Sequence, residues 1–259
     1  MKRNICIIGL IVLLISGVLL AGCGAVIKKT AGPATAREYS FTDFNSIEIG
    51  YAFKLEVTPA DTYSITIDAN ESDFEHIKVN KNGDKLEIGL DGWFFHFGRT
   101  PRVKITMPEL RGLSLSGASE GSVTGFRSSA DLDLSLSGAS ELQMDVETGA
   151  FVCDLSGASE VTGTLKSASA DIVLSGASQI RLTGSGGNVR IELSGASQAD
   201  LEEFAVNDAD INFTGASDGS LEINGRLDVS LSGASELQYS GNPILGDMDI
   251  TGGSSLKRR

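Results

Sequence analysis

Two segments of the chain match the Gly-x-Ser-x-Gly pattern that surrounds the nucleophilic serine of many hydrolases. Residues 117–121 read GASEG and residues 215–219 read GASDG. That pattern supports acyl transfer when a strand-to-helix turn exposes the serine beside a histidine base. Here both segments are copies of one repeated motif, no helical pattern follows either, and the chain has only two histidines, His76 and His96. We therefore predict no catalytic residue and a structural role for these serines.

Acidic side chains recur at one offset from the same motif. Three residues after its first glycine stand Glu120, Glu141, Glu160, Gln179, Gln198, Asp218 and Glu236. Carboxylates stacked one strand apart repel each other unless water or a cation screens them. We favour a solvated acidic face that prevents sideways association. The alternatives are contact with a bridging Ca²⁺ ion or with a glycan, and a glycosidase or lyase groove, although a regular column creates carboxylate pairs without selection for chemistry.

An aromatic cluster is the preferred candidate for contact with a ligand or partner. Trp93, Phe94, Phe95, His96 and Phe97 contain the only tryptophan and three of the 11 phenylalanines. Such a cluster either plugs the first layer of a core or forms an exposed patch that stacks on sugar rings, another chain or a membrane interface. Two histidines without a clustered set of further ligands make a poor zinc site, so no metal site is predicted there.

The elements that position these residues follow from a repeat. Ser-Gly-Ala-Ser or a close variant recurs every 18 to 21 residues, with its first glycine at positions 117, 138, 157, 176, 195, 215, 233 and 252. Apolar residues stand two and four positions before each glycine, and most positions between them are polar. Alternation also follows the motif, which indicates strands with one face inward. A period near 19 is typical of strand-based solenoids.

The predicted fold is all-β: a right-handed parallel β-helix of about eight coils of about 19 residues over residues 111–256. Each coil buries about four large apolar side chains worth roughly 1.5 to 3 kcal/mol each, too little to order a lone coil, so stability comes from stacking. The glycine and alanine allow a tight bend, and we expect the serine columns to form hydrogen bonds along the stack. Cys153 occupies a core column and is predicted to be a small buried hydrophobe.

Residues 39–110 are predicted to form a β-rich N-terminal head with a hairpin turn at Asn82-Gly83. They are either degenerate opening coils or an apposed β-layer, because a solenoid must hide its first apolar layer and its edge. Residues 257–259 form a basic tail that we expect to cover the last edge.

The N-terminal sequence predicts export and lipidation. Residues 1–22 carry a basic start and an apolar run, and Leu20-Ala21-Gly22-Cys23 is typical of a bacterial lipobox. Cys23 would then be acylated and residues 23–38 would form the tether that links the lipid to the folded part. An uncleaved transmembrane anchor is the alternative. In a host with two membranes, Gly24 after the cysteine favours the outer membrane.

Charge excludes one class of partner. The 259 residues carry a formal net charge of −13, whereas binding to nucleic acid requires a basic surface. The membrane is expected as a partner through the lipid at Cys23.

The motifs also resemble a known family. Residues 44–57 (Phe44-x-x-Ile47-x-Ile49 and Phe53-x-Leu55-x-Val57), residues 108–119, the later Ser-Gly-Ala-Ser copies and residues 239–243 are similar to the bacterial auto-transporter adhesin family with the head GIN domain. The resemblance runs from about Tyr39 to Leu256. It implies a right-handed β-helix on a secreted or surface-anchored protein and an adhesive role, and it supplies no catalytic residues.

These observations together predict a non-enzymatic, surface-exposed lipoprotein that binds glycans or proteins in the manner of an adhesin, with homo-oligomers as a further option. One alternative is a carbohydrate-active enzyme, a glycosidase or lyase, that uses the acidic columns. Another is a structural envelope scaffold without an external ligand.

Overall fold

A computed structural model describes residues 34–91 and 99–259 of the chain. Gly32–Arg259 forms one compact unit, which contains every residue of the hydrophobic core cluster. Its described elements are one short 3-10 helix, Glu71–Asp73, and the strands β1 (Ala34–Tyr39), β2 (Ser46–Ile49), β3 (Lys54–Pro59), β4 (Ser64–Asn70), β5 (Ile77–Asn82), β6 (Lys85–Leu90), β7 (Arg102–Met107), β8 (Gly112–Leu115), β9 (Glu120–Arg127), β10 (Leu132–Leu136), β11 (Glu141–Leu155), β12 (Glu160–Leu174), β13 (Gln179–Leu193), β14 (Gln198–Val206), β15 (Ala209–Phe213), β16 (Asp218–Ile223), β17 (Arg226–Leu231), β18 (Glu236–Gly241), β19 (Ile244–Ile250) and β20 (Ser255–Arg258).

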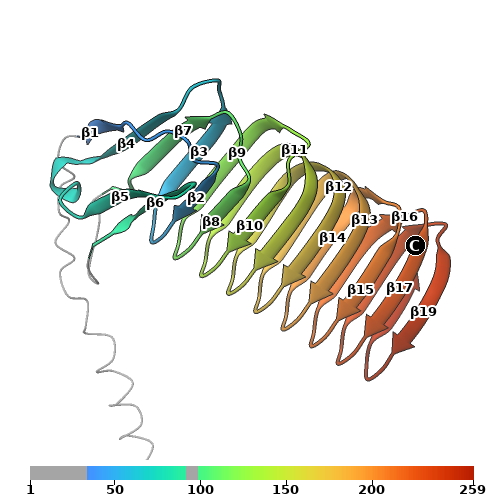
Figure 1. The fold of residues 1–259 in the computed structure, drawn as a ribbon. Coiled ribbons are helices and arrows are strands. Elements are labelled where there is room, and N and C mark those ends of the chain that lie inside the picture. The colour runs from blue at the N-terminus through green and yellow to red at the C-terminus, as the bar shows by residue number, and fades with distance from the viewer. Residues whose placement is uncertain (1–33, 92–98) are drawn as a thin grey trace, which may run out of the picture. The chain divides into compact units, whose positions relative to one another are not determined.

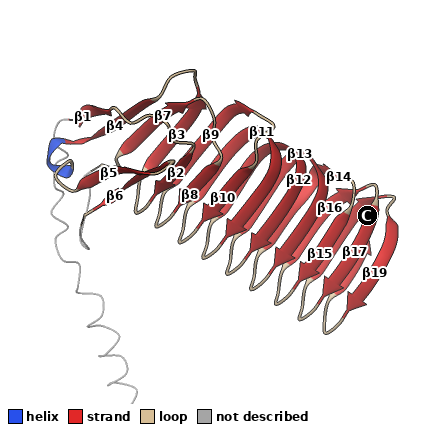
Figure 2. Cartoon of the chain, viewed as in Figure 1, coloured by secondary structure: helices blue, strands red, loops and turns tan. Residues whose placement is uncertain are grey.

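The strands form two parallel ladders (Figures 1 and 2). The first ladder runs in the spatial order β6, β2, β8, β10, β11, β12, β13, β15, β17, β19. The second ladder runs β7, β3, β9, β11, β12, β13, β14, β16, β18, β20. The 15-residue strands β11, β12 and β13 take part in both ladders because they continue around one corner of the coil. The chain is therefore a β-solenoid, and the prediction of a parallel β-helix is confirmed.

Alternation of side chains builds a single core between the ladders. In β10, Leu132, Leu134 and Leu136 are buried while Asp133 and Ser135 are exposed. Register is strict because a shift by one residue would place the leucines in water. Cys153 is fully buried in the same core, and burial raises the pKa of its thiol. The free cysteine is thus a core side chain, as predicted.

The Ser-Gly-Ala-Ser turn brings successive coils into backbone contact. Gly176 has φ +78°, and a Cβ atom placed on it would lie 2.5 Å from the carbonyl oxygen of Gly157. That same oxygen accepts a 2.7 Å hydrogen bond from the amide of Ala177. Glycine is required here for two reasons, a left-handed backbone and the space taken by the preceding turn.

The expected hydrogen bonding along the stack is found at the first position of several motifs, whereas most of the second serines bond within their own turn. The buried hydroxyl of Ser178 donates to the carbonyl of Ser175 in its own turn, at 2.8 Å. The first serine reaches back to the preceding coil, with Ser175 Oγ 3.4 Å from the carbonyl oxygen of Leu155. Among the second serines, Ser119 also donates to the carbonyl of Tyr51 in the neighbouring coil. The physical reason is that closing the turn leaves the Ser175 carbonyl without a backbone donor, and the nearest hydroxyl satisfies it.

The N-terminal end combines both architectures that the sequence left open. The coils β2–β3 and β6–β7 stack on the motif-bearing coils, with β2–β3 inserted between β6–β7 and β8–β9. Beyond them, β5 pairs antiparallel with β6, β4 with β7, and β1 with β4. The β5–β6 hairpin turns at Gly83, which has φ +62°, as predicted. Antiparallel strands therefore cover the edges of both ladders at this end.

Candidate ligand-binding face

The acidic column forms on the outer face of the second ladder. Glu120, Glu141 and Glu160 are each the first residue of a strand, directly after a Ser-Gly-Ala-Ser turn. Strand pairing places them in register, and it continues the same column in the following coils through Gln179, Gln198, Asp218 and Glu236. The turn fixes this arrangement because, after each copy of the motif, the next strand begins three residues beyond the motif glycine.

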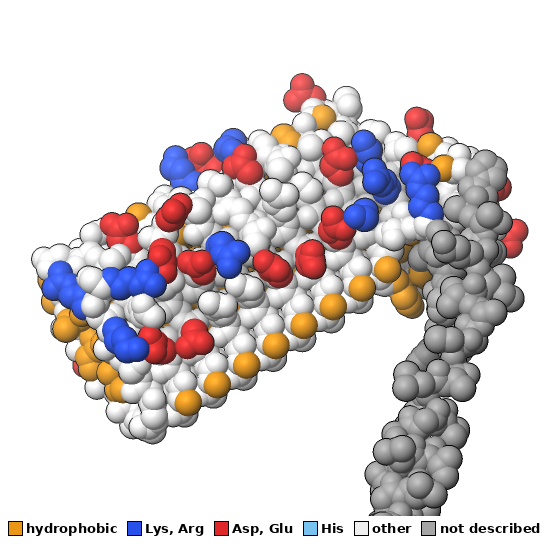
Figure 3. All heavy atoms as spheres, turned by 180° about the vertical axis from the view of Figure 1, so that it is seen from behind, with side chains coloured by type: hydrophobic (Ala, Val, Ile, Leu, Met, Phe, Trp, Pro, Cys, Tyr) orange, Lys and Arg blue, Asp and Glu red, His pale blue; other side chains and the backbone are white. Residues whose placement is uncertain are grey.

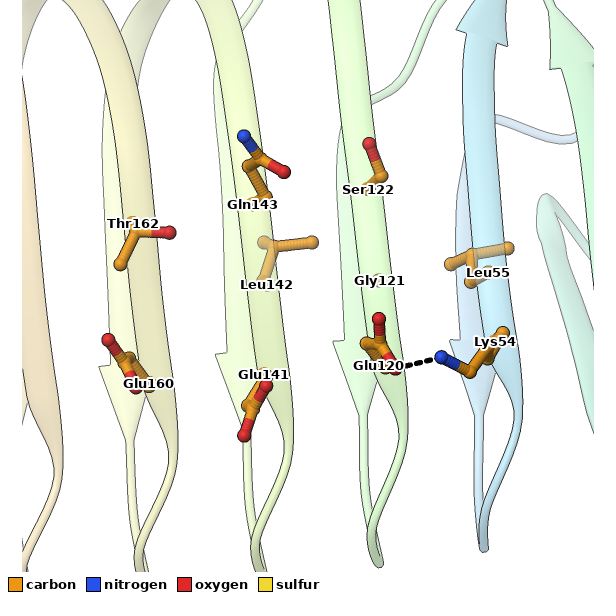
Figure 4. A pocket seen from close by; sticks show the side chains of 10 residues that line it. All are labelled: Lys54, Leu55, Glu120, Gly121, Ser122, Glu141, Leu142, Gln143, Glu160 and Thr162. Atoms are coloured by element: carbon orange, nitrogen blue, oxygen red, sulfur yellow. Dashed lines mark hydrogen bonds and ion pairs between the residues drawn. The ribbon is translucent and has the colours of Figure 1, made fainter. Parts of the chain in front are cut away.

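A groove of about 290 Å³ runs across the N-terminal part of this column (Figure 4). Lys54 of β3 lies beside Glu120, with its Nζ 2.5 Å from Glu120 Oε2. Glu141 and Glu160 form no ion pair with any residue that the structure describes. Three carboxylates against one ammonium leave the groove acidic.

A second column lines the groove and was missed by the sequence analysis. Ser122, Gln143 and Thr162 follow the acidic residues by two positions and are in register with one another. Their uncharged hydroxyl and amide groups can both donate and accept hydrogen bonds. The signal was present, because these residues stand five positions after the motif glycine. Lys54 gave no such signal, because its turn at Gly50-Tyr51 lacks the motif.

The C-terminal part of the acidic column is partly neutralised. A hydrogen bond from Lys257 lowers the pKa of Glu236, and Gln238 adds a further hydrogen bond. Gln179 and Gln198 pair through their amides at 3.3 Å in the middle of the column. No group of three or more His, Cys, Asp or Glu side chains within residues 34–91 and 99–259 is arranged to hold a metal ion.

The serines that match the hydrolase pattern are buried. Ser119 Oγ donates to the carbonyl oxygens of Ser116 and Tyr51, each at 3.0 Å. Ser217 Oγ donates to the carbonyl of Thr214 at 2.8 Å. These hydroxyls close turns and are not presented to solvent, in agreement with the structural role predicted for them.

Ion pairs cross the outer surface between neighbouring coils. Arg127 contacts Asp145 at 2.8 Å and Arg181 contacts Asp200 at 3.0 Å. Figure 3 shows charged side chains of both signs over the strands and a row of apolar side chains along one edge. The alanines of the Ser-Gly-Ala-Ser turns are exposed. Exposed pairs of this kind contribute little stability. The face shown in Figure 3 thus carries charges of both signs over its strands.

Two of the predicted sites lie outside the described residues. They are the lipidation residue Cys23 and the aromatic cluster Trp93 to Phe97. Within the part of the chain that the structure describes, no helix has the length and apolar character needed to cross a membrane.

Comparison with known proteins identifies a family and a fold. The family model described as "Putative auto-transporter adhesin, head GIN domain" matches residues 43–243. A putative adhesin from Parabacteroides merdae has a similar structure, with a TM-score of 0.83 and 18% identity over 88% of this chain and 97% of that one. A putative lipid binding protein from Parabacteroides distasonis has a TM-score of 0.82 and 16% identity, over 88% of this chain and 97% of that one. No curated protein matches the chain.

Proposed function

Because the chain belongs to the family described as "Putative auto-transporter adhesin, head GIN domain", we propose that it is a lipid-anchored, extracytoplasmic adhesin that binds polysaccharide through the outer face of its second ladder. Membership of the family supports an adhesin-like role at the cell surface. The groove over Glu120, Glu141 and Glu160 is the observation that carries the choice of face.

The groove favours a neutral or amine-bearing sugar polymer. Its carboxylates repel sulfated or uronic-acid polymers, since like charges at this distance are unfavourable. Its second column, Ser122, Gln143 and Thr162, offers hydrogen bonds at intervals of one strand spacing, about 4.8 Å. An extended polymer could therefore form similar contacts with successive coils, which gives affinity through repetition.

Removing the central carboxylate is expected to weaken glycan binding. On an array of neutral, amine-bearing and anionic glycans, we expect the chain starting at Gly32 to bind members of the first two groups. Glu141→Ala should raise the Kd about tenfold or more, because hydrogen bonds to a charged group contribute roughly 1.5–3 kcal/mol. Asp154→Ala is the matched control, because Asp154 is an exposed carboxylate on the first ladder.

Two outcomes would contradict this proposal. Equal loss of binding in Asp154→Ala would show that net charge, rather than the groove, determines affinity. Release of reducing sugar from a polysaccharide, abolished by Glu141→Ala, would establish the carbohydrate-active enzyme instead.

Acylation of Cys23 is tested separately. In cells supplied with a radiolabelled fatty acid, the wild-type chain should carry the label and fractionate with membranes. Cys23→Ser should lose both the label and cleavage after Gly22, because the thiol is the acylated group. Cys153→Ser is the control and should keep both, since Cys153 is buried in the core. A labelled Cys23→Ser chain would contradict the lipid anchor.

A further inference from the structure

The C-terminal end of the solenoid exposes its core. Ile250 occupies the column of Leu231 and Met248 that of Val229. Leu231 and Val229 are 1% and 4% exposed, whereas Ile250 and Met248 are 41% and 37% exposed. Leu245 in the same strand is 53% exposed. These residues keep the inward register of a core, but no described strand packs over them.

Both edges at this end are unpaired. Among the described strands, β19 pairs only with β17 and β20 pairs only with β18. Each therefore presents a row of free backbone donors and acceptors, which is a template for another strand. The N-terminal end differs because β1, β4 and β5 cover it.

We propose that a second copy of this chain covers the C-terminal end, with β19 of each copy pairing antiparallel with β20 of the other. A solenoid rises by one strand spacing per coil, so β20 lies about half a spacing, roughly 2.4 Å, beyond β19. If β19 paired with β19 of the second copy and β20 with β20, the distance between the strands of one pair would exceed that of the other by a full strand spacing. Pairing β19 with β20 gives equal spacing on both sides, under one two-fold axis parallel to the strands.

Charge complementarity between the outward residues supports this arrangement. In the antiparallel register that keeps inward residues opposite one another, four pairs form: Ile250 with Leu256, Asp249 with Lys257, Met248 with Arg258, and Asp247 with Arg259 of the second copy. The outward pairs are of opposite charge, which is favourable for directly opposed cross-strand residues. The side chain of Asp247 is fully exposed in the single chain. Lys257 and Arg259 are half-exposed beside Glu236 and Glu202 of their own chain, at the rim of the end.

The pairing places the two chain starts far apart. The described chain begins at β1, at the opposite end of the stack from β19 and β20. In a pair joined at the C-terminal ends, the two β1 strands therefore lie at the two outer ends. If each chain carries the lipid proposed at Cys23, the pair can join two facing membranes. This last step rests on the proposed function, whereas the pairing itself does not.

Charge reversal tests the pairing in solution, using the chain from Gly32 onward. Sedimentation velocity should give twice the monomer mass for the wild type. The variant with Asp247→Lys and Asp249→Lys, and the variant with Lys257→Glu and Arg259→Glu, should each be monomeric alone and should form a dimer when mixed. Circular dichroism of both variants should match the wild type, which confirms folding. A wild type that stays monomeric at its highest soluble concentration, or variants that associate as the wild type does, would overturn the proposal.

A disulfide tests which strands meet. The double variant with Asp249→Cys and Lys257→Cys should form disulfide-linked dimers on air oxidation, because directly opposed cross-strand residues lie within disulfide range. Cys153 does not interfere because it is buried. Linked dimers of the Asp249→Cys single variant would show that β19 pairs with itself and would overturn the proposed register.

Vesicles test the link between membranes. Chains attached to nickel-lipid vesicles through an N-terminal histidine tag should aggregate the vesicles, and each charge-reversed variant alone should not. Vesicles bearing one variant should aggregate only with vesicles bearing the other. Because the tag replaces the acyl chains, the result does not depend on lipidation. Absence of aggregation with glycan binding intact would overturn the bridging role and leave the proposed function standing.

Discussion

Replacing Gly176 by alanine is expected to lower the free energy of unfolding by at least about 3 kcal/mol. Its φ of +78° disfavours any side chain, at a cost of roughly 1–2 kcal/mol. The added Cβ would also lie 2.5 Å from the carbonyl oxygen of Gly157, so the two coils must separate and strain the hydrogen bond from Ala177 to that oxygen. Urea unfolding followed by circular dichroism measures the loss.

Gly83→Ala is the control for backbone strain alone. Gly83 also has a positive φ, +62°, but no atom lies within 4 Å of the position its Cβ would take. We expect Gly83→Ala to cost about 1 kcal/mol. Equal losses for the two variants would show that the close approach of the coils contributes nothing, and that the glycine is retained only for its backbone conformation.

Replacing Phe213 by alanine is expected to lower the free energy of unfolding by roughly 3–5 kcal/mol, since a large cavity is left in a closed core. Phe213 is 1% exposed and is the only aromatic residue in a column otherwise filled by leucine and isoleucine. The extra volume is accommodated by Gly219, because a Cβ on that glycine would lie 2.5 Å from the Phe213 ring. Neighbouring coils have Ala199 or Leu237 at the position of Gly219.

A double-mutant cycle tests this compensation. Phe213→Leu leaves a void and Gly219→Val overpacks the ring, so each single variant should be destabilised by about 1–3 kcal/mol. The double variant should be more stable than the sum of the two losses predicts, by about 1 kcal/mol or more. Additive losses would mean that the two residues do not share one space.

Much of the fold could be predicted from sequence because successive coils of a solenoid share one local sequence pattern. Each copy of the motif specifies one bend, and the alternation around it specifies which side chains face inward, as in β10. The acidic column follows for the same reason, since a fixed offset from the turn becomes a fixed place on the surface. The groove could not be predicted from the motif, because Lys54 follows a turn that lacks it. Tyr51, with φ +75°, stands in that turn where the motif has a glycine.

The sequence by itself determined the strand periodicity, the inward columns and the bend at each glycine, because these depend on residues within one coil. Only the tertiary structure decided the order of the first coils, since β2–β3 is inserted between β6–β7 and β8–β9 through contacts distant in the chain. It also decided that the second serine closes its own turn in motif copies such as those of Ser178 and Ser197. Finally, it decided that Ile250 and Met248 are exposed although they follow the core pattern. A periodic pattern specifies which face of a strand is apolar, whereas burial depends on whether another layer lies above it.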